Sequence, residues 1–100
     1  MVKPPPDFIS MACTTASVSY REALTPQELV HALLTGEVPD RRRAHFHVLL
    51  DEAPIPLLRG LIEQVGRRAT CEQVASNFSR IAGELGTCRD TRAWLSPWLG

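Results

Sequence analysis

The stretch TPQELVHALLTG, residues 25–36, decides the fold class of this chain. Thr25 can cap a helix, Pro26 suits its first turn, and Glu28 completes the reciprocal hydrogen bonds of a capping box. Gly36 supplies the stop, because glycine tolerates the left-handed conformation that ends many helices. The apolar residues between these signals share one helical face, which predicts an amphipathic helix: Leu29, Val30, Leu33 and Leu34.

A second amphipathic pattern runs from Pro56 to Gly66. Pro56 again suits a first helical turn, and Gly66 is expected to end the helix. Gly60 lies inside the pattern, where glycine costs about 1 kcal/mol relative to alanine. The apolar positions repeat the spacing of the first stretch: Leu57, Leu58, Leu61, Ile62 and Val65.

A third pattern begins at Thr70, with Gln73 placed to complete a second capping box. Its apolar stripe stops at Gly86, and residues 87–90 can cap a last short helix that runs to Leu95. The stripe consists of Val74, Ala75, Phe78, Ile81, Ala82 and Leu85.

Two segments, residues 14–20 and 43–49, fit helix and strand alike. Apolar Ala16, Val18 and Tyr20 alternate with serines, which is strand spacing, although residues before them share a helical face. Residues 43–49 belong to a segment of about twelve residues, a length that favours helix over strand. A strand there would have to pair with residues 16–20.

Together these patterns predict an all-α fold, a compact bundle of four to five short helices joined by short connections. An α+β variant with a two-stranded ribbon remains open. Residues 1–7 are expected to form a disordered proline-rich arm, and residues 8–100 a single helical domain. Either Met1 or Met11 could be the native start.

The composition fits a globular domain, with 44% hydrophobic and 22% charged residues in a chain of 100. Eleven basic residues balance eleven acidic ones, so the formal net charge is zero. A zero balance provides no overall field to attract nucleic acid or an anionic membrane. It also leaves little repulsion against self-association, so a homodimer is compatible with the sequence.

The cysteines and histidines give no sign of a disulfide framework or a metal site. Three cysteines, Cys13, Cys71 and Cys88, occur without a CxxC motif, which suggests free thiols in a reducing cytoplasm. His45 and His47 are two positions apart, a spacing that separates their side chains on a helix. No stretch is long and apolar enough to span a bilayer, and no catalytic motif is present. We therefore expect no metal, no cofactor and no enzymatic activity.

Two surface features point to a macromolecular partner. Arg41, Arg42 and Arg43 form a basic run that could meet an acidic surface, although a solvated charged face is the simpler interpretation. The last residues of the chain carry a pair of tryptophans, a residue type enriched at the centres of protein interfaces. The expected partner contacts there are Trp94, Leu95, Trp98 and Leu99.

Residues 81–95 resemble the helix-turn-helix of bacterial regulators. Ala82 matches the small residue of that family's first helix, and Gly86 matches the glycine of its turn. The resemblance implies a recognition helix in the major groove that begins with Cys88, Arg89, Thr91 and Arg92. Arg92 departs from the pattern, because the family carries a buried valine or isoleucine at that position.

These observations predict a small cytoplasmic regulatory or adaptor protein that binds and controls another protein, as an antiactivator, inhibitor or chaperone does. The alternative is a DNA-binding transcriptional regulator that uses residues 81–95. A small enzyme is the third class. Retention of duplex DNA with a steep salt dependence would separate the second class from the first.

Overall fold

The computed structural model describes residues 7–18 and 20–99, apart from the side chains of Arg92 and Ala93. The described chain forms α1 (Phe8–Ser17), α2 (Pro26–Thr35), η1 (Asp40–Arg42), α3 (Arg43–Glu52), α4 (Ile55–Gly66), α5 (Cys71–Leu85) and α6 (Arg92–Leu99). Here η1 is a single turn of 3₁₀ helix. No strand occurs within these ranges. The prediction of an all-α bundle of short helices is confirmed, and the two-stranded ribbon is not formed.

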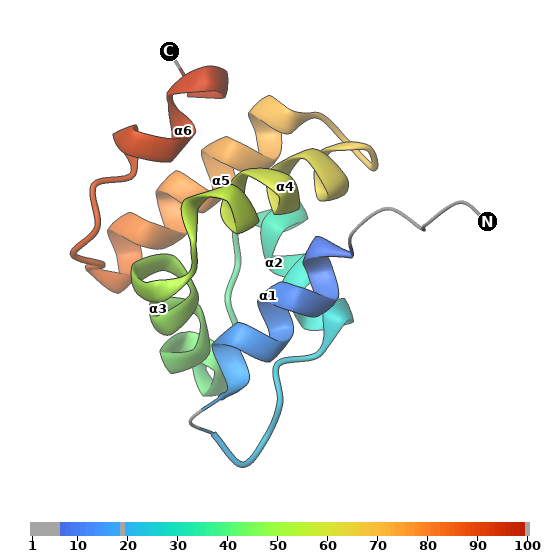
Figure 1. Cartoon of the computed structure of the whole chain (residues 1–100), viewed down its shortest axis with the longest axis vertical. Coiled ribbons are helices and arrows are strands. Elements are labelled where there is room, and N and C mark those ends of the chain that lie inside the picture. Colours follow the sequence, from blue (N-terminus) through green and yellow to red (C-terminus); the bar gives the residue numbers. More distant parts are fainter. Residues whose placement is uncertain (1–6, 19, 100) are drawn as a thin grey trace.

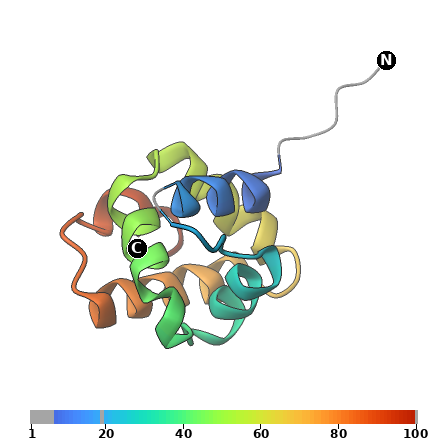
Figure 2. The same ribbon diagram turned by 90° about the horizontal axis from the view of Figure 1, so that it is seen from below.

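Helix α4 is the centre of the bundle. It packs against α1 on one side and α5 on the other, and it also touches α2 and α6 (Figure 1). Viewed from below, α1 and α5 lie on opposite sides of the molecule (Figure 2). Since α4 faces neighbours on several sides, more than half of its residues are buried: Leu57, Leu58, Gly60, Leu61, Ile62, Val65 and Gly66.

Both ambiguous segments are helical up to the ends of α1 and α3. In α1 the small residues Ala12 and Ala16 are completely buried, so the helix backbone approaches its neighbours closely. Asp7, expected in the arm, is instead the N-cap of α1 and accepts a hydrogen bond from the Ser10 amide. The Gln64 side chain on α4 accepts a further bond from the Phe8 amide at 2.8 Å. The remaining expected arm, residues 1–6, lies outside the described part of the chain.

The helix ends agree with most of the sequence signals. The Thr25–Glu28 capping box is complete, and Gly36 closes α2 with φ of +80°. Gly86 closes α5 in the same way with φ of +66°. The second box is only half formed: Thr70 accepts from the Gln73 amide at 3.0 Å, but the Gln73 side chain turns to Asn77 on the next turn.

The last helix differs from the prediction at both ends. It begins at Arg92 rather than near residue 88, and it continues through Pro97 to Leu99. The start is displaced because the Asp51 carboxylate on α3 accepts hydrogen bonds from the amides of Cys88 and Arg89, both at 2.9 Å. Those amides are therefore held by α3 instead of opening a helix. No helix in the described ranges is long and apolar enough to cross a bilayer.

Candidate functional site

Two of the four C-terminal residues expected to contact a partner belong to the core. Trp94 is completely buried, with its ring edge-on to Phe78 at a centroid distance of 5.2 Å. Leu95 is 2% exposed beside it. Trp98 is half-buried against the same core, whereas Leu99 is 44% exposed. Of these four residues, Leu99 and part of Trp98 are therefore left for contact with another molecule.

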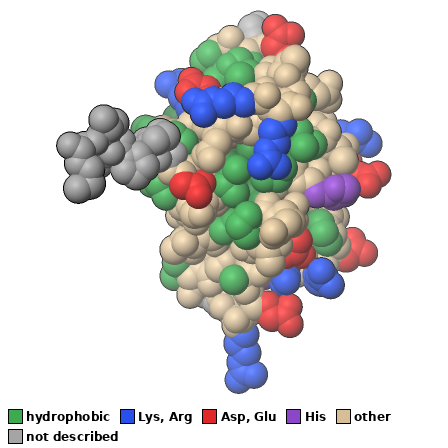
Figure 3. Space-filling view, turned by 90° about the vertical axis from the view of Figure 1, so that its right-hand side faces the viewer, with side chains coloured by type: hydrophobic (Ala, Val, Ile, Leu, Met, Phe, Trp, Pro, Cys, Tyr) green, Lys and Arg blue, Asp and Glu red, His purple; other side chains and the backbone are tan. Residues whose placement is uncertain are grey.

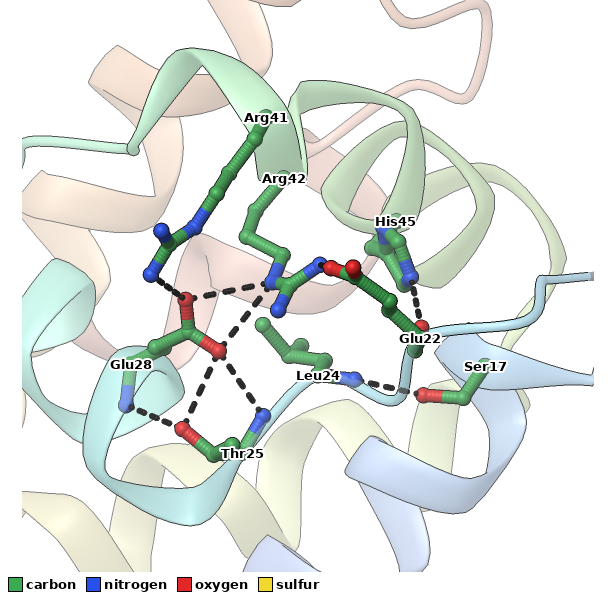
Figure 4. Close-up of polar contacts among 8 residues, drawn as sticks. All are labelled: Ser17, Glu22, Leu24, Thr25, Glu28, Arg41, Arg42 and His45. Atoms are coloured by element: carbon green, nitrogen blue, oxygen red, sulfur yellow. Dashed lines mark hydrogen bonds and ion pairs between the residues drawn. The ribbon is translucent and has the colours of Figure 1, made fainter.

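The basic run at residues 41–43 is divided between core and surface. Arg42 is 7% exposed and lies between two carboxylates, with Nε 3.1 Å from Glu28 and Nη1 3.1 Å from Glu22 (Figure 4). Arg41 is exposed and shares the Glu28 carboxylate at 3.2 Å. Arg43 is exposed and reaches a backbone carbonyl on α5. The three arginines therefore do not form one continuous basic patch.

Glu28 is held as a carboxylate by this arrangement. Burial alone would raise its pKa, but the hydrogen bonds from the Thr25 backbone and from the guanidinium groups of Arg42 and Arg41 lower the pKa to about 2. Figure 4 shows the same carboxylate capping α2 and binding both arginines. The N-terminus of α2 is thus tied to η1, so this cluster stabilises the fold.

The loop between α1 and α2 is fixed to the bundle by three further contacts. The Leu24 amide donates to the Ser17 hydroxyl at 2.9 Å, and a His45 ring nitrogen lies 2.8 Å from the Glu22 carbonyl. The ring of Tyr20 covers His45 at a centroid distance of 4.2 Å. These contacts fix the position of the loop, which borders the surface beside α1.

The residues of the helix-turn-helix resemblance have other partners. Cys88 and Arg89 are in the α5–α6 loop, and the Arg89 guanidinium donates to the Ala53 carbonyl. Thr91 precedes α6, and the Arg92 side chain lies outside the described part. A recognition helix that begins at Cys88 is therefore not formed.

The histidines do not gather. No group of three or more metal-ligating side chains occurs within the described ranges. His47 instead pairs with Asp51 one turn along α3, with Nδ1 3.3 Å from the carboxylate, as the spacing of four predicts.

An open hollow with an apolar floor lies between α1 and α2. It has a volume of about 450 Å³ and shows both apolar and polar side chains. Ile9 and Val30 form its floor and are each slightly exposed, at 9% and 8%. The full lining comprises Ile9, Pro26, Gln27, Val30, His31, Leu34 and Arg68.

A second hollow, of about 360 Å³, adjoins α1 one helical turn further on. Cys13 stands four residues after Ile9, so both side chains lie on the same side of α1. The loop residues Ala23 and Leu24, which come just before the N-cap Thr25 of α2, form the opposite wall. The second hollow lies between α1 and the loop that leads to α2, shares no lining residue with the first, and is lined by Cys13, Thr14, Ser17, Val18, Ala23 and Leu24. We call the two neighbouring hollows together the α1–α2 groove.

Cys13 contributes an apolar surface to the groove and not a nucleophile. Burial, reinforced by the negative charges of Asp7 and Glu28, raises the pKa of its thiol to about 11. The reactive form of cysteine is the thiolate, which is scarce at neutral pH for such a group. The groove is therefore suited to packing an apolar side chain and not to covalent chemistry.

The sequence patterns do not predict this groove, although α1 carries one signal of it. Helix α1 contains no charged residue in FISMACTTAS, unlike an ordinary surface helix. Met11 and Val18 are exposed at 47% and 79%. Figure 3 views the side of the molecule that carries the α4–α5 turn, where hydrophobic side chains are interspersed with charged ones.

Comparison with known protein families, with curated proteins and with solved structures finds no match to this chain.

Proposed function

We propose that this chain is a non-catalytic regulatory or adaptor protein, and that it binds an amphipathic helix of a partner protein in the α1–α2 groove. The observation that carries the proposal is the arrangement of Ile9, Cys13 and Val30. All three belong to the core cluster, yet each retains 8–9% exposure at the floor of an open groove. A partner side chain can therefore extend the core outward.

The groove fits the helix-in-groove mode of recognition, in which an apolar helical face settles between two helices. Ile9 and Cys13 on α1, like Val30 and Leu34 on α2, are spaced by one turn. A partner helix with apolar residues at i, i+3 or i+4, and i+7 presents the same spacing. Burying two or three such side chains at about 1.5–3 kcal/mol each contributes about 3–9 kcal/mol before the cost of association, about 4 kcal/mol or more, is subtracted, so the groove supports a weak and transient complex.

Such a protein acts by mass action. A partner whose apolar helix is buried in the groove is withdrawn from its other contacts, in proportion to the concentration and affinity of this chain. An antiactivator, an inhibitor and a chaperone all work in this way, and the groove supports each of them equally.

The test is a selection of displayed amphipathic peptides on the folded protein, followed by mapping of the best binder by NMR chemical shifts. We expect the shifts to centre on the amides of Ile9, Cys13 and Val30. Leu34→Lys should weaken binding about tenfold, whereas Leu99→Lys, a matched change at an exposed leucine outside the groove, should leave it unchanged. Shifts centred on α6 or α3 would contradict the proposal.

Titration with duplex DNA separates this proposal from the DNA-binding alternative. A protein that neutralises several phosphates loses affinity steeply as salt is raised. The groove proposal predicts no retention of duplex DNA at moderate salt, and salt-dependent retention would favour the alternative.

A further inference from the structure

We infer that the partner helix carries an acidic side chain at the end of the groove where Arg68 and His31 stand. The inference rests on the proposed function and specifies the chemistry of its partner. Arg68 and His31 both line the first hollow, which has no aspartate or glutamate in its lining. This hollow therefore combines an apolar floor with the guanidinium of Arg68 and the imidazole of His31.

Arg68 is the arginine in the lining of the first hollow, and it has no carboxylate partner among the described residues. Arg41 and Arg42 bind Glu28, and Arg80 binds Glu84 at 3.4 Å. Arg68 is exposed and makes no side-chain ion pair or hydrogen bond with any described residue. A guanidinium presents a planar set of hydrogen-bond donors that matches a carboxylate. Arg68 can therefore donate hydrogen bonds to a carboxylate of a partner.

The positive charge of Arg68 lies at one end of the groove and not along its whole length. It lies just after the end of α4, at the turn towards α5, while His31 lies on the second turn of α2. On the side of the molecule that carries this turn, basic side chains stand beside hydrophobic ones (Figure 3). The second hollow, at the other end of the groove, is lined by uncharged residues. An acidic group at one end of the partner helix would therefore fix which way the helix runs.

An acidic peptide is favoured over a nucleic acid because the floor of the hollow is apolar. Ile9, Val30 and Leu34 offer nothing to a phosphate, whereas an amphipathic helix can satisfy the floor and the basic end at once. The chain's zero net charge also gives no general attraction for a polyanion.

The experiment uses a displayed peptide library with a fixed leucine stripe and one randomised position at the end of the helix. Selection on the wild-type protein should enrich Asp and Glu at that position. Selection on Arg68→Glu should enrich Lys and Arg. Arg67→Glu is the matched control, because Arg67 is an adjacent exposed arginine outside the lining, and it should still select acidic residues.

Calorimetry on two synthetic peptides that differ only by Glu or Gln at the selected position gives the magnitude. We expect the Glu peptide to bind about three- to fivefold more tightly at low salt, with the difference falling as salt is added. Arg68→Glu should reverse the preference and keep the melting temperature of the wild type.

Each other outcome overturns a distinct part of the argument. Equal binding of the two peptides, or an equal effect of Arg67→Glu, would refute the acidic partner and leave the groove standing. Failure of every peptide to bind would refute the groove and the inference together. Displacement of a bound peptide by duplex DNA would assign the basic end to nucleic acid instead.

Discussion

The Arg42 guanidinium Nε lies 3.1 Å from each oxygen of the Glu28 carboxylate. The same carboxylate accepts from the Thr25 amide at 3.2 Å, so one side chain both caps α2 and holds η1. Nη1 of Arg42 continues to Glu22 in the loop that walls the groove. Three segments, the loop, α2 and η1, are thus joined through a nearly buried arginine.

Replacing Arg42 should destabilise the protein far more than replacing its neighbour. Arg42→Met removes the group that neutralises Glu28 and Glu22, and we expect the melting temperature to fall by several degrees. Arg41→Met removes an exposed partner of the same carboxylate and should change the melting temperature by about a degree. Thermal unfolding followed by circular dichroism measures both, and equal losses would place the stabilising contact at the surface pair.

The Glu28 carboxylate predicts a specific loss of stability in acid. Its pKa is about 2 in the folded protein against an ordinary value of 4.5, so its contribution is fully present above about pH 4.5 and is lost as the pH falls towards 2. This contribution is about 3 kcal/mol in the unscreened limit and about 1–2 kcal/mol once solvent screening is included.

Glu28→Gln isolates that charge, because glutamine can still complete the capping box. The variant should be less stable at pH 7 and should lose less stability than the wild type between pH 4.5 and 2. Glu63→Gln, at an exposed glutamate of α4, should follow the wild-type curve. Urea unfolding across this pH range gives the comparison, and parallel curves for wild type and Glu28→Gln would contradict the prediction.

Local signals could be predicted from the sequence because the groups that make them are close along the chain. The capping box joins residues three apart. Gly36 stands directly after the periodic apolar run, and its φ of +80° is the left-handed conformation expected of a glycine that ends a helix. The partners of Arg42 are 14 and 20 positions away. Helical periodicity relates residues only a few positions apart, so it does not predict these contacts. From the sequence alone, residues 41–43 are equally compatible with an exposed basic patch.

The same limit explains the two tryptophans and the groove. Trp94 is buried because α6 folds back onto Phe78 of α5, which depends on how the loop is held by Asp51 of α3. The groove exists because α1 lies beside α2 and beside the loop that leads to α2. Helical spacing shows that Ile9 and Cys13 share a face, but not which of the buried faces retains a few per cent of exposure.

Gly60 is expected to resist the usual stabilising change to alanine. A Cβ at this position would lie 2.5 Å from the Phe8 ring, which packs against the core where α1 meets α4. The gain of about 1 kcal/mol in helix propensity is then outweighed by overpacking, which typically costs about 1–3 kcal/mol. Gly83 of α5 has open space around it, so Gly83→Ala should stabilise the protein by about 0.5–1 kcal/mol.

Urea unfolding of the two alanine variants tests whether the free energy of unfolding falls for Gly60→Ala and rises for Gly83→Ala. In a Phe8→Ala background the obstacle is gone, and Gly60→Ala should become neutral or stabilising, as a double-mutant cycle would show. A stabilised Gly60→Ala in the wild-type background would mean that the Phe8 ring moves aside without loss.

The three cysteines should differ sharply in reactivity, and Cys13 should report on the groove. Cys88 is exposed, while the pKa of about 11 at Cys13 leaves about one thiol in a thousand ionised at pH 8. A disulfide reagent at pH 8 should therefore modify Cys88 rapidly and Cys13 only slowly, with Cys71 between them. Because Cys13 lies on the groove floor, a bound helical peptide should slow its modification further and leave Cys88 unchanged. Mass spectrometry of timed samples measures each rate, and rapid labelling of Cys13 in the folded protein would show that the floor is far more open to water than its 8% exposure implies.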